Sequence, residues 1–129
     1  MATWDDVARL ALALPEATED PSHSGTRSWR VRDKAFAWER PLRRADVAEL
    51  GDAAPSGPVL AVRVPDVEAR TALIADSPGV YFATSHFAGY PAVLIWLEEI
   101  SVDELAEVLD EAWECRAPRR LIADRRGTA

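Results

Sequence analysis

The sequence predicts an α+β protein with two layers, in which helices pack on one face of an antiparallel sheet of about five strands. Three observations predict this class. Apolar residues recur at helical spacing near both ends of the chain, short β-branched and aromatic runs separated by turn residues fill the middle, and the expected element order is αβββαββα. Runs of strands broken by single helices favour an antiparallel sheet covered on one face.

The first predicted helix spans residues 3–14. Thr3 and Asp6 have the spacing of a capping box, in which each side chain bonds to the backbone N–H of the other residue. An apolar stripe follows at helical spacing, made of Trp4, Val7, Leu10, Ala11 and Leu14. Residues 15–25 begin with a proline and are rich in Pro, Ser, Glu and Asp, so we expect a loop there.

A β-hairpin is predicted next, from strands at residues 27–31 and 35–39 joined by a short polar connection. Alternation places Trp29 and Val31 on one face of the first strand. The same rule places Phe36 and Trp38 together on one face of the second strand.

A longer connection at residues 41–57 follows, with a helical turn expected at 45–50. The third strand is predicted at 59–64. A helix is predicted at 65–75, because Pro65 suits the first turn of a helix, where its missing N–H is not needed.

The last two strands are expected at residues 80–83 and 92–97. The second of these is apolar on both sides, with Val93, Ile95 and Leu97 on one and Leu94 and Trp96 on the other. A strand with two apolar faces needs cover on both. That cover could come from the 41–57 connection, from the C-terminal segment, from a second copy of the chain or from a ligand in a groove.

The final helix is predicted to begin after Ser101, which forms a capping box with Glu104. Its buried face carries Val102, Leu105, Ala106, Leu109, Ala112 and Trp113. Pro118 is expected to interrupt or kink the helix. We therefore predict a single domain at residues 1–123 and a frayed tail at 124–129.

Composition favours an intracellular location. The chain has one cysteine, Cys115, which excludes an intrachain disulfide and fits a reducing compartment. No basic segment precedes an apolar run at the N-terminus, and no apolar run approaches the roughly 20 residues that span a bilayer. We expect a cytoplasmic protein that does not bind membranes.

The charge pattern is uneven. The net charge of −7 argues against tight non-specific binding to DNA, since phosphate contacts need a basic excess. However, seven of the 15 basic residues lie between Arg27 and Arg44, and five lie between Arg116 and Arg126. Eight acids and no base lie between Glu98 and Glu114, so the sequence predicts a basic region and an acidic helix.

Several motifs resemble the MmcQ/YjbR family. Residues 82–94, with His86-Phe87-Ala88-Gly89-Tyr90-Pro91 at their centre, resemble its H-[FY]-x-G-Y-P-x-V-L signature. Supporting matches are Leu14-Pro15-Glu16, residues 36–46, and Ala112-Trp113 followed by residues 117–121. The resemblance implies a two-layer fold related to CyaY-like and secretion-chaperone-like proteins. It also implies DNA binding through a winged substructure, a role that rests on fold analogy, and it supplies no catalytic residues.

The arginines form the first candidate site, an anion-binding surface for a phosphate backbone or an acidic partner. Its proposed members are Arg30, Arg32, Arg40, Arg43 and Arg44, with Arg119 and Arg120 in support. The alternative is a solvated surface that offsets the acidic helix. For Arg119 and Arg120 the alternative is a favourable interaction with the dipole at a helix C-terminus.

Aromatic residues form the second candidate site, a ligand or interface surface made of Trp38, His86, Phe87, Tyr90 and Trp96. Here the alternatives are a structural turn at residues 86–91 and ordinary core packing of the tryptophans. His23 and His86 are the only histidines, and they lack the spacing of a metal site. We therefore predict no metal, no cofactor and no catalytic residue.

Two functions remain open from the sequence. The first is a non-enzymatic DNA-binding protein whose binding is weak and sensitive to salt. The second is a homodimeric module that binds a protein or a small ligand on the open face of the sheet, around Trp38 and Trp96. An enzyme ranks last, because catalysis needs positioned acid, base or nucleophile groups that the sequence does not assemble.

Overall fold

The structure is a computed structural model that describes residues 2–21, 26–54 and 57–127. Six strands form one antiparallel sheet in the order β1-β2-β3-β4-β6-β5. The strands are β1 Ala17–Pro21, β2 Arg27–Val31, β3 Lys34–Glu39, β4 Val59–Arg63, β5 Tyr81–Phe82 and β6 Ala92–Trp96. The α-helices are α1 Trp4–Leu12, α2 Arg44–Leu50, α3 Val67–Asp76, α4 Val102–Arg116 and α5 Arg119–Gly127. Short 3-10 turns are η1 Gly51–Ala53, η2 Ser85–Phe87 and η3 Leu97–Glu99.

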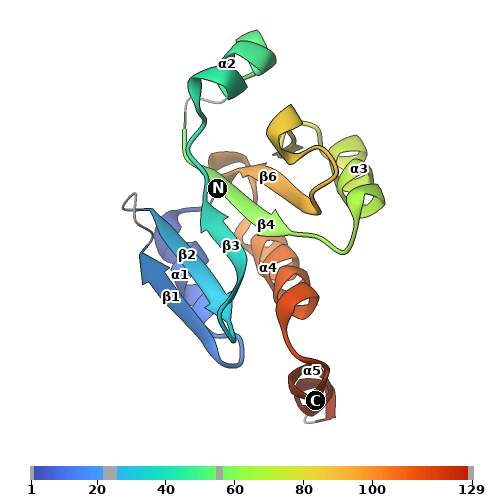
Figure 1. Cartoon of the computed structure of the whole chain (residues 1–129). Helices are drawn as coiled ribbons and strands as arrows, with labels where there is room; N and C mark the ends of the chain where they lie inside the picture. The colour runs from blue at the N-terminus through green and yellow to red at the C-terminus, as the bar shows by residue number, and fades with distance from the viewer. Residues whose placement is uncertain (1, 22–25, 55–56, 128–129) are drawn as a thin grey trace.

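The main core lies on the first face of the sheet, which α1 and α4 cover from the same side (Figure 1). Trp29 from β2 and Trp113 from α4 are fully buried there. Both indole N–H groups are satisfied: Trp29 donates to Glu19 Oε1 at 3.0 Å and Trp113 donates to the carbonyl oxygen of Pro15 at 2.9 Å. The predicted α+β class, with its antiparallel sheet and helical layer, is confirmed.

A β-bulge in the hairpin decides which side chains reach the second face. The register shifts between Trp29, paired with Ala37, and Arg30, paired with Ala35, so Phe36 is the extra residue. Phe36 therefore joins the main core while Trp38 lies on the opposite face. The prediction that Phe36 and Trp38 share a face was wrong, because strict alternation does not survive a bulge.

The second face carries a smaller core that includes Ala61, Leu94 and Phe87. Phe87 comes from η2, and Leu42 from the segment after β3 adds partial cover. The C-terminal segment packs elsewhere, since Leu121 of α5 contacts the main core. Of the sources of cover that the sequence leaves open, the 41–57 connection contributes, and residues around η2 contribute as well.

Residues 15–25, expected to be a loop, contain the edge strand β1. All five residues of β1 pair with β2, from Ala17 opposite Val31 to Pro21 opposite Arg27. The segment is polar and ends in proline, a composition typical of loops that an edge strand also tolerates. This strand raises the count from the expected five to six.

The remaining local predictions concern caps and breaks. The Thr3 hydroxyl accepts from the Asp6 N–H, and Asp6 accepts from the Thr3 N–H, which confirms the capping box. Ala117, extended before Pro118, separates α4 from α5 as expected. The segment expected to fray, 124–129, is helical as far as Gly127, and residues 128 and 129 lie outside the described residues. Within the described chain, every helix is too short or too polar to cross a bilayer.

Candidate functional site

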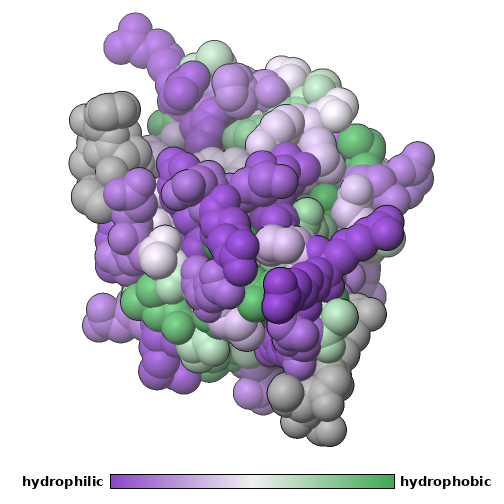
Figure 2. All heavy atoms as spheres, turned by 60° about the horizontal axis from the view of Figure 1, so that its bottom comes forward, coloured by the Kyte–Doolittle hydropathy of each residue, from purple (hydrophilic) through white to green (hydrophobic). Residues whose placement is uncertain are grey.

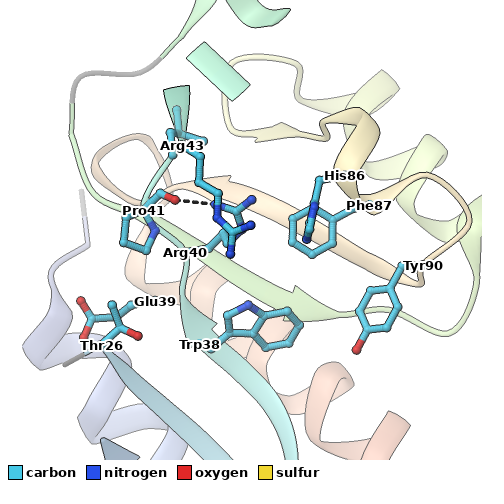
Figure 3. A pocket seen from close by; sticks show the side chains of 10 residues that line it. Thr26, Trp38, Glu39, Arg40, Pro41, Arg43, His86, Phe87 and Tyr90 are labelled. Carbon is cyan, nitrogen blue, oxygen red and sulfur yellow. Dashed lines mark hydrogen bonds between the residues drawn. The ribbon is translucent and has the colours of Figure 1, made fainter. Parts of the chain in front are cut away.

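A cleft of about 710 Å³ opens on the second face of the sheet (Figure 3). Its wall is formed by Thr26, Trp38, Glu39, Arg40, Pro41, Leu42, Arg43, His86, Phe87 and Tyr90. These residues come from four places: the position just before β2, the end of β3, the segment that leads into α2, and the turn between β5 and β6. A volume of this size is typical of small-molecule sites.

The cleft unites residues from both candidate sites of the sequence. Trp38, which β3 projects from the second face, lies between two arginines and the aromatic residues of the η2 turn (Figure 3). Arg40 and Arg43 come from the predicted anion surface. His86, Phe87 and Tyr90 come from the predicted aromatic surface. The segment 86–91 is thus a turn, as one alternative held, and it also lines the cleft.

Arg40 forms a buried ion pair behind the cleft. Its side chain is 8% exposed, and its Nη2 lies 3.1 Å from Oδ2 of Asp46, whose side chain is 5% exposed. The same carboxylate accepts the backbone N–H of Arg43 at 2.9 Å. Arg40 also donates to the carbonyl of Pro41 and lies 5.3 Å from the ring centroid of Phe87. Arg40 therefore holds the wall together, and its charge is not free on an open surface as the sequence suggested.

The pKa of Asp46 reflects this network. Burial acts to raise the pKa, but the backbone N–H of Arg43 and the charge of Arg40 outweigh it. The pKa therefore lies below the ordinary value for an aspartate, and the carboxylate is charged at neutral pH. The charge of Arg40 is locally compensated.

Arg70 of α3 fixes the turn between β5 and β6, which begins with η2 and which we call the η2 turn. It is 8% exposed, and its Nη1 lies within hydrogen-bonding distance of three carbonyl oxygens, at 2.7 Å for Phe87, 3.0 Å for Tyr90 and 3.3 Å for Ala92. A buried guanidinium with carbonyl acceptors stabilises an irregular segment that has few ladder bonds of its own. Sequence reasoning missed Arg70, because one arginine in a short helix is ordinarily solvent-exposed.

A second tie comes from α2. The carboxylate of Glu49 accepts the backbone N–H of Ser85 at 3.0 Å and also bonds to its hydroxyl. Gly89 has a φ of +77°, a left-handed conformation that glycine adopts without strain. The turn is thus shaped by polar anchors on both sides and by a glycine at its tip.

The aromatic side chains of the turn are in contact with one another and with a cation. His86 meets Phe87 edge-on at 5.0 Å between ring centroids, and Phe87 lies 6.1 Å from Tyr90. Arg63 of β4 lies 4.9 Å from the Tyr90 centroid. Tyr90 remains 44% exposed, so one large aromatic side chain borders the cleft in contact with solvent.

A smaller hollow of about 270 Å³ adjoins the cleft and shares three of its residues, Thr26, Trp38 and Tyr90. It extends towards the hairpin, where Arg30 and Ala35 line it. The two hollows form one groove across the second face, which we call the second-face groove, with the two aromatic residues at its centre.

Of the other predicted arginines near the hairpin and α2, Arg30 and Arg32 are neutralised and, among the described residues, Arg44 is not. Arg30 Nε lies 3.6 Å from Oδ2 of Asp20 and 3.3 Å from the hydroxyl of Ser28. Arg32, in the hairpin turn, forms an exposed two-point ion pair with Glu16 and lowers the pKa of that carboxyl group. Arg44 is exposed at the start of α2, next to Arg43.

Arg119 and Arg120 lie away from the groove. They are exposed in the first turn of α5, which lies at the opposite end of the molecule from α2 (Figure 1). The proposed dipole interaction is therefore wrong for these two residues, since they occupy a helix N-terminus. Seen from that end, the surface is mainly hydrophilic, with small separate apolar areas (Figure 2).

Trp96 and the histidines are the remaining residues that the sequence analysis considered. Trp96 is partly buried on the second face but lies outside the groove. Within the described residues, no three His, Cys, Asp or Glu side chains are grouped closely enough to hold a metal ion. His23 lies outside the described residues.

The sequence model of the family described as YjbR matches residues 12–115. The chain belongs to the YjbR family. The match confirms the resemblance drawn from the motifs, and it includes every residue that lines the second-face groove. The α5 helix, with Arg119 and Arg120, follows the matched segment.

Similar proteins extend this finding. Two curated relatives, "Uncharacterized protein Mb2600" of Mycobacterium bovis and "Uncharacterized protein Rv2570" of Mycobacterium tuberculosis, are each 51% identical over 125 residues, covering 95% of this chain and 94% of theirs. The crystal structure of Deinococcus radiodurans protein DR2400, with a DUF419 domain, superposes with a TM-score of 0.65. It covers 88% of this chain and 77% of that one at 19% identity, which supports the fold alone.

Proposed function

We propose that this YjbR-family chain is a non-enzymatic DNA-binding protein that uses the second-face groove and its arginine rim. One observation carries the proposal: the fold brings Tyr90, distant in the sequence, to the same cleft as Trp38 and Arg43. Arginine and aromatic side chains together are the usual means by which proteins hold nucleic acid.

We define the rim as Arg43, which lines the larger cleft, and its neighbour in the sequence, Arg44. Both are exposed, and neither takes part in an ion pair with any residue that the structure describes. Arg40 and Arg32 contribute less, because carboxylates compensate their charges. With two uncompensated arginines at the rim and a net charge of −7 on the chain, we expect weak binding that salt readily abolishes.

The non-enzymatic part of the proposal rests on what the charged groups of the cleft already do. Glu39 accepts from both the backbone and the side chain of Arg27, and Arg40 is held by Asp46. These are structural bonds, which leave those groups unsuited to proton transfer. The proposal includes the cytoplasmic location that the single cysteine predicts.

The test is fluorescence anisotropy of a labelled duplex, titrated from low to physiological salt. In the double variant Arg43→Glu/Arg44→Glu, affinity should fall alike for every DNA sequence, and the slope of log K against log salt should shrink by about 2. The matched control is Arg119→Glu/Arg120→Glu, which makes the same charge change at the far end.

Two results would reject the proposed surface. One is an equal loss of DNA affinity in both double variants, which would show that the loss comes from the change in net charge and not from one surface. The other is no binding to wild-type protein even at low salt. Circular dichroism of each variant should match the wild type, because all four side chains are exposed.

A second candidate is a homodimeric module. The observation that favours it is the partial exposure of Trp96, on a strand that is otherwise buried, outside the second-face groove. A second copy of the chain could cover that part of the face. Native mass spectrometry at micromolar concentration tests this candidate, and a strictly monomeric protein would reject it.

A further inference from the structure

We infer that the second-face groove takes an unpaired nucleotide unit, that is, a planar base that carries a phosphate group. The inference deepens the proposed function and rests on it for the location of the site. It goes further, because a base-paired duplex does not present free base faces to a groove. It can therefore fail while the proposed function stands.

The first support is the position of the two central aromatic residues. Trp38 and Tyr90 each line both hollows of the groove, so a ligand that spans the groove must pass them. Tyr90 is 44% exposed and Trp38 is only partly buried, whereas Trp29, Phe36 and Phe87 are buried. Partly exposed rings at the centre of a groove are the usual stacking platform for unpaired bases.

The second support is the rigidity of the platform. The three carbonyls that Arg70 holds belong to Phe87, Tyr90 and Ala92, so the backbone that carries the Tyr90 ring is fixed. Trp38 lies in a strand paired on both sides, opposite Ser28 and Ala61. Two rings on fixed backbone lose little freedom when a planar ligand binds between or beside them.

The third support is the charge of the groove. In the larger cleft, Glu39 is offset by Arg27 and Arg40 is offset by Asp46. Arg43 has no ion-pair partner among the described residues and extends into the cleft in Figure 3. One uncompensated guanidinium matches one phosphate, and its planar fork suits phosphate oxygens.

The size of the site fits this ligand. The larger cleft, of about 710 Å³, falls within the range that holds small molecules, and the smaller hollow continues it past the rings. The unit could come from a free nucleotide or from a single strand. Both sources share the same base and phosphate, so the experiment must separate them.

The experiment uses three probes with the full chain: a labelled oligo(dT) of about ten nucleotides, a labelled duplex of equal length, and thymidine 5′-monophosphate as a competitor. We expect the oligo(dT) to bind more tightly than the duplex. Trp38→Leu and Tyr90→Leu should each weaken oligo(dT) binding about tenfold and weaken duplex binding much less. Trp96→Leu, a tryptophan change on the same face outside the groove, should have no effect.

Of the two aromatic variants, Tyr90→Leu is the one expected to fold normally, because the Tyr90 ring is exposed and the bonds that anchor this residue come from its backbone.

Competition by the monophosphate at low concentration would assign the site to free nucleotides, and competition by the strand alone would assign it to single-stranded DNA. Either result supports the nucleotide unit. Equal affinity for single strand and duplex, with both aromatic variants neutral, would overturn the inference but leave the arginine rim. Binding of the monophosphate without any binding of DNA would support the inference and reject the proposed function. No binding of any probe would overturn both.

Discussion

The two faces of the sheet differ in what holds their cover in place. On the first face, α1 and α4 bury a continuous apolar core that contains Trp29 and Trp113. On the second face, a short irregular turn covers a few apolar residues around Ala61 and Leu94. The same strands supply both faces, so the difference arises from the covering segments and not from the sheet.

Polar anchors replace apolar area on the second face. Arg70 bonds to the carbonyls of the η2 turn, Glu49 bonds to Ser85, and Arg40 pairs with Asp46. Hydrogen bonds and ion pairs are directional, whereas apolar burial is not. The first face is therefore stabilised mainly by burial, and the second face is shaped by a few directed bonds that leave a groove open between them.

The largest expected effect on stability comes from comparing one tryptophan ring on each face of the sheet. Trp29 and Trp38 lie on neighbouring strands of the hairpin and point to opposite faces. Trp29→Ala should lower the free energy of unfolding by about 3–5 kcal/mol, because it opens a cavity and leaves Glu19 without its donor. Trp38→Ala should lower it by only about 1 kcal/mol, since that ring is partly exposed.

Urea unfolding of both variants, followed by circular dichroism, measures this contrast. Leu12→Ala is a suitable control, because Leu12 is 46% exposed on α1 and its truncation should change little. Equal losses for the two tryptophan variants would contradict the division between a sealed face and an open one.

The buried ion pair gives the next effect. Asp46→Asn leaves the Arg40 charge without its carboxylate, and we expect a loss of about 2–3 kcal/mol at neutral pH. The pKa of Asp46 is lowered in the folded protein, so its contribution is complete above the pKa that it has in the unfolded chain. It is lost as the pH falls through the lower pKa of the folded state.

The stability gap between wild type and Asp46→Asn should therefore narrow below pH 4 or so. Urea midpoints of both proteins at neutral and at acidic pH provide the measurement. A gap that stays constant with pH would show that the carboxylate charge of Asp46 does not stabilise the second face.

Most of the fold follows from local patterns that the sequence displays. The capping box at Thr3, the hairpin turn at Arg32-Asp33 and the break at Pro118 each depend on neighbouring residues. β1 could not be predicted in this way, because its residues are polar and its strand conformation comes from pairing with β2. The bulge at Phe36 is likewise a property of two paired strands and not of one.

The same distinction, between local patterns and contacts between separate segments, applies to the candidate site. The aromatic turn at His86 and Tyr90 is visible as a motif, and the arginines near Arg43 are visible as a charge cluster. Their meeting in one groove was not predictable, since it depends on sheet order. Nor was the neutralisation of Arg40 by Asp46, because an ion pair six residues apart across a loop has no periodic pattern.

The most local expected effect concerns Arg70. Arg70→Met keeps much of the side-chain length but removes the donor shared by three carbonyls, so we expect a global loss of about 1–2 kcal/mol. Amide hydrogen exchange should rise sharply in residues 85–92 and remain unchanged in α1 and α4. Arg70→Lys should recover part of the protection, because an ammonium group can reach fewer of the carbonyls. If exchange rises equally over both faces, Arg70 stabilises the whole core, and directed bonds are not what distinguishes the second face.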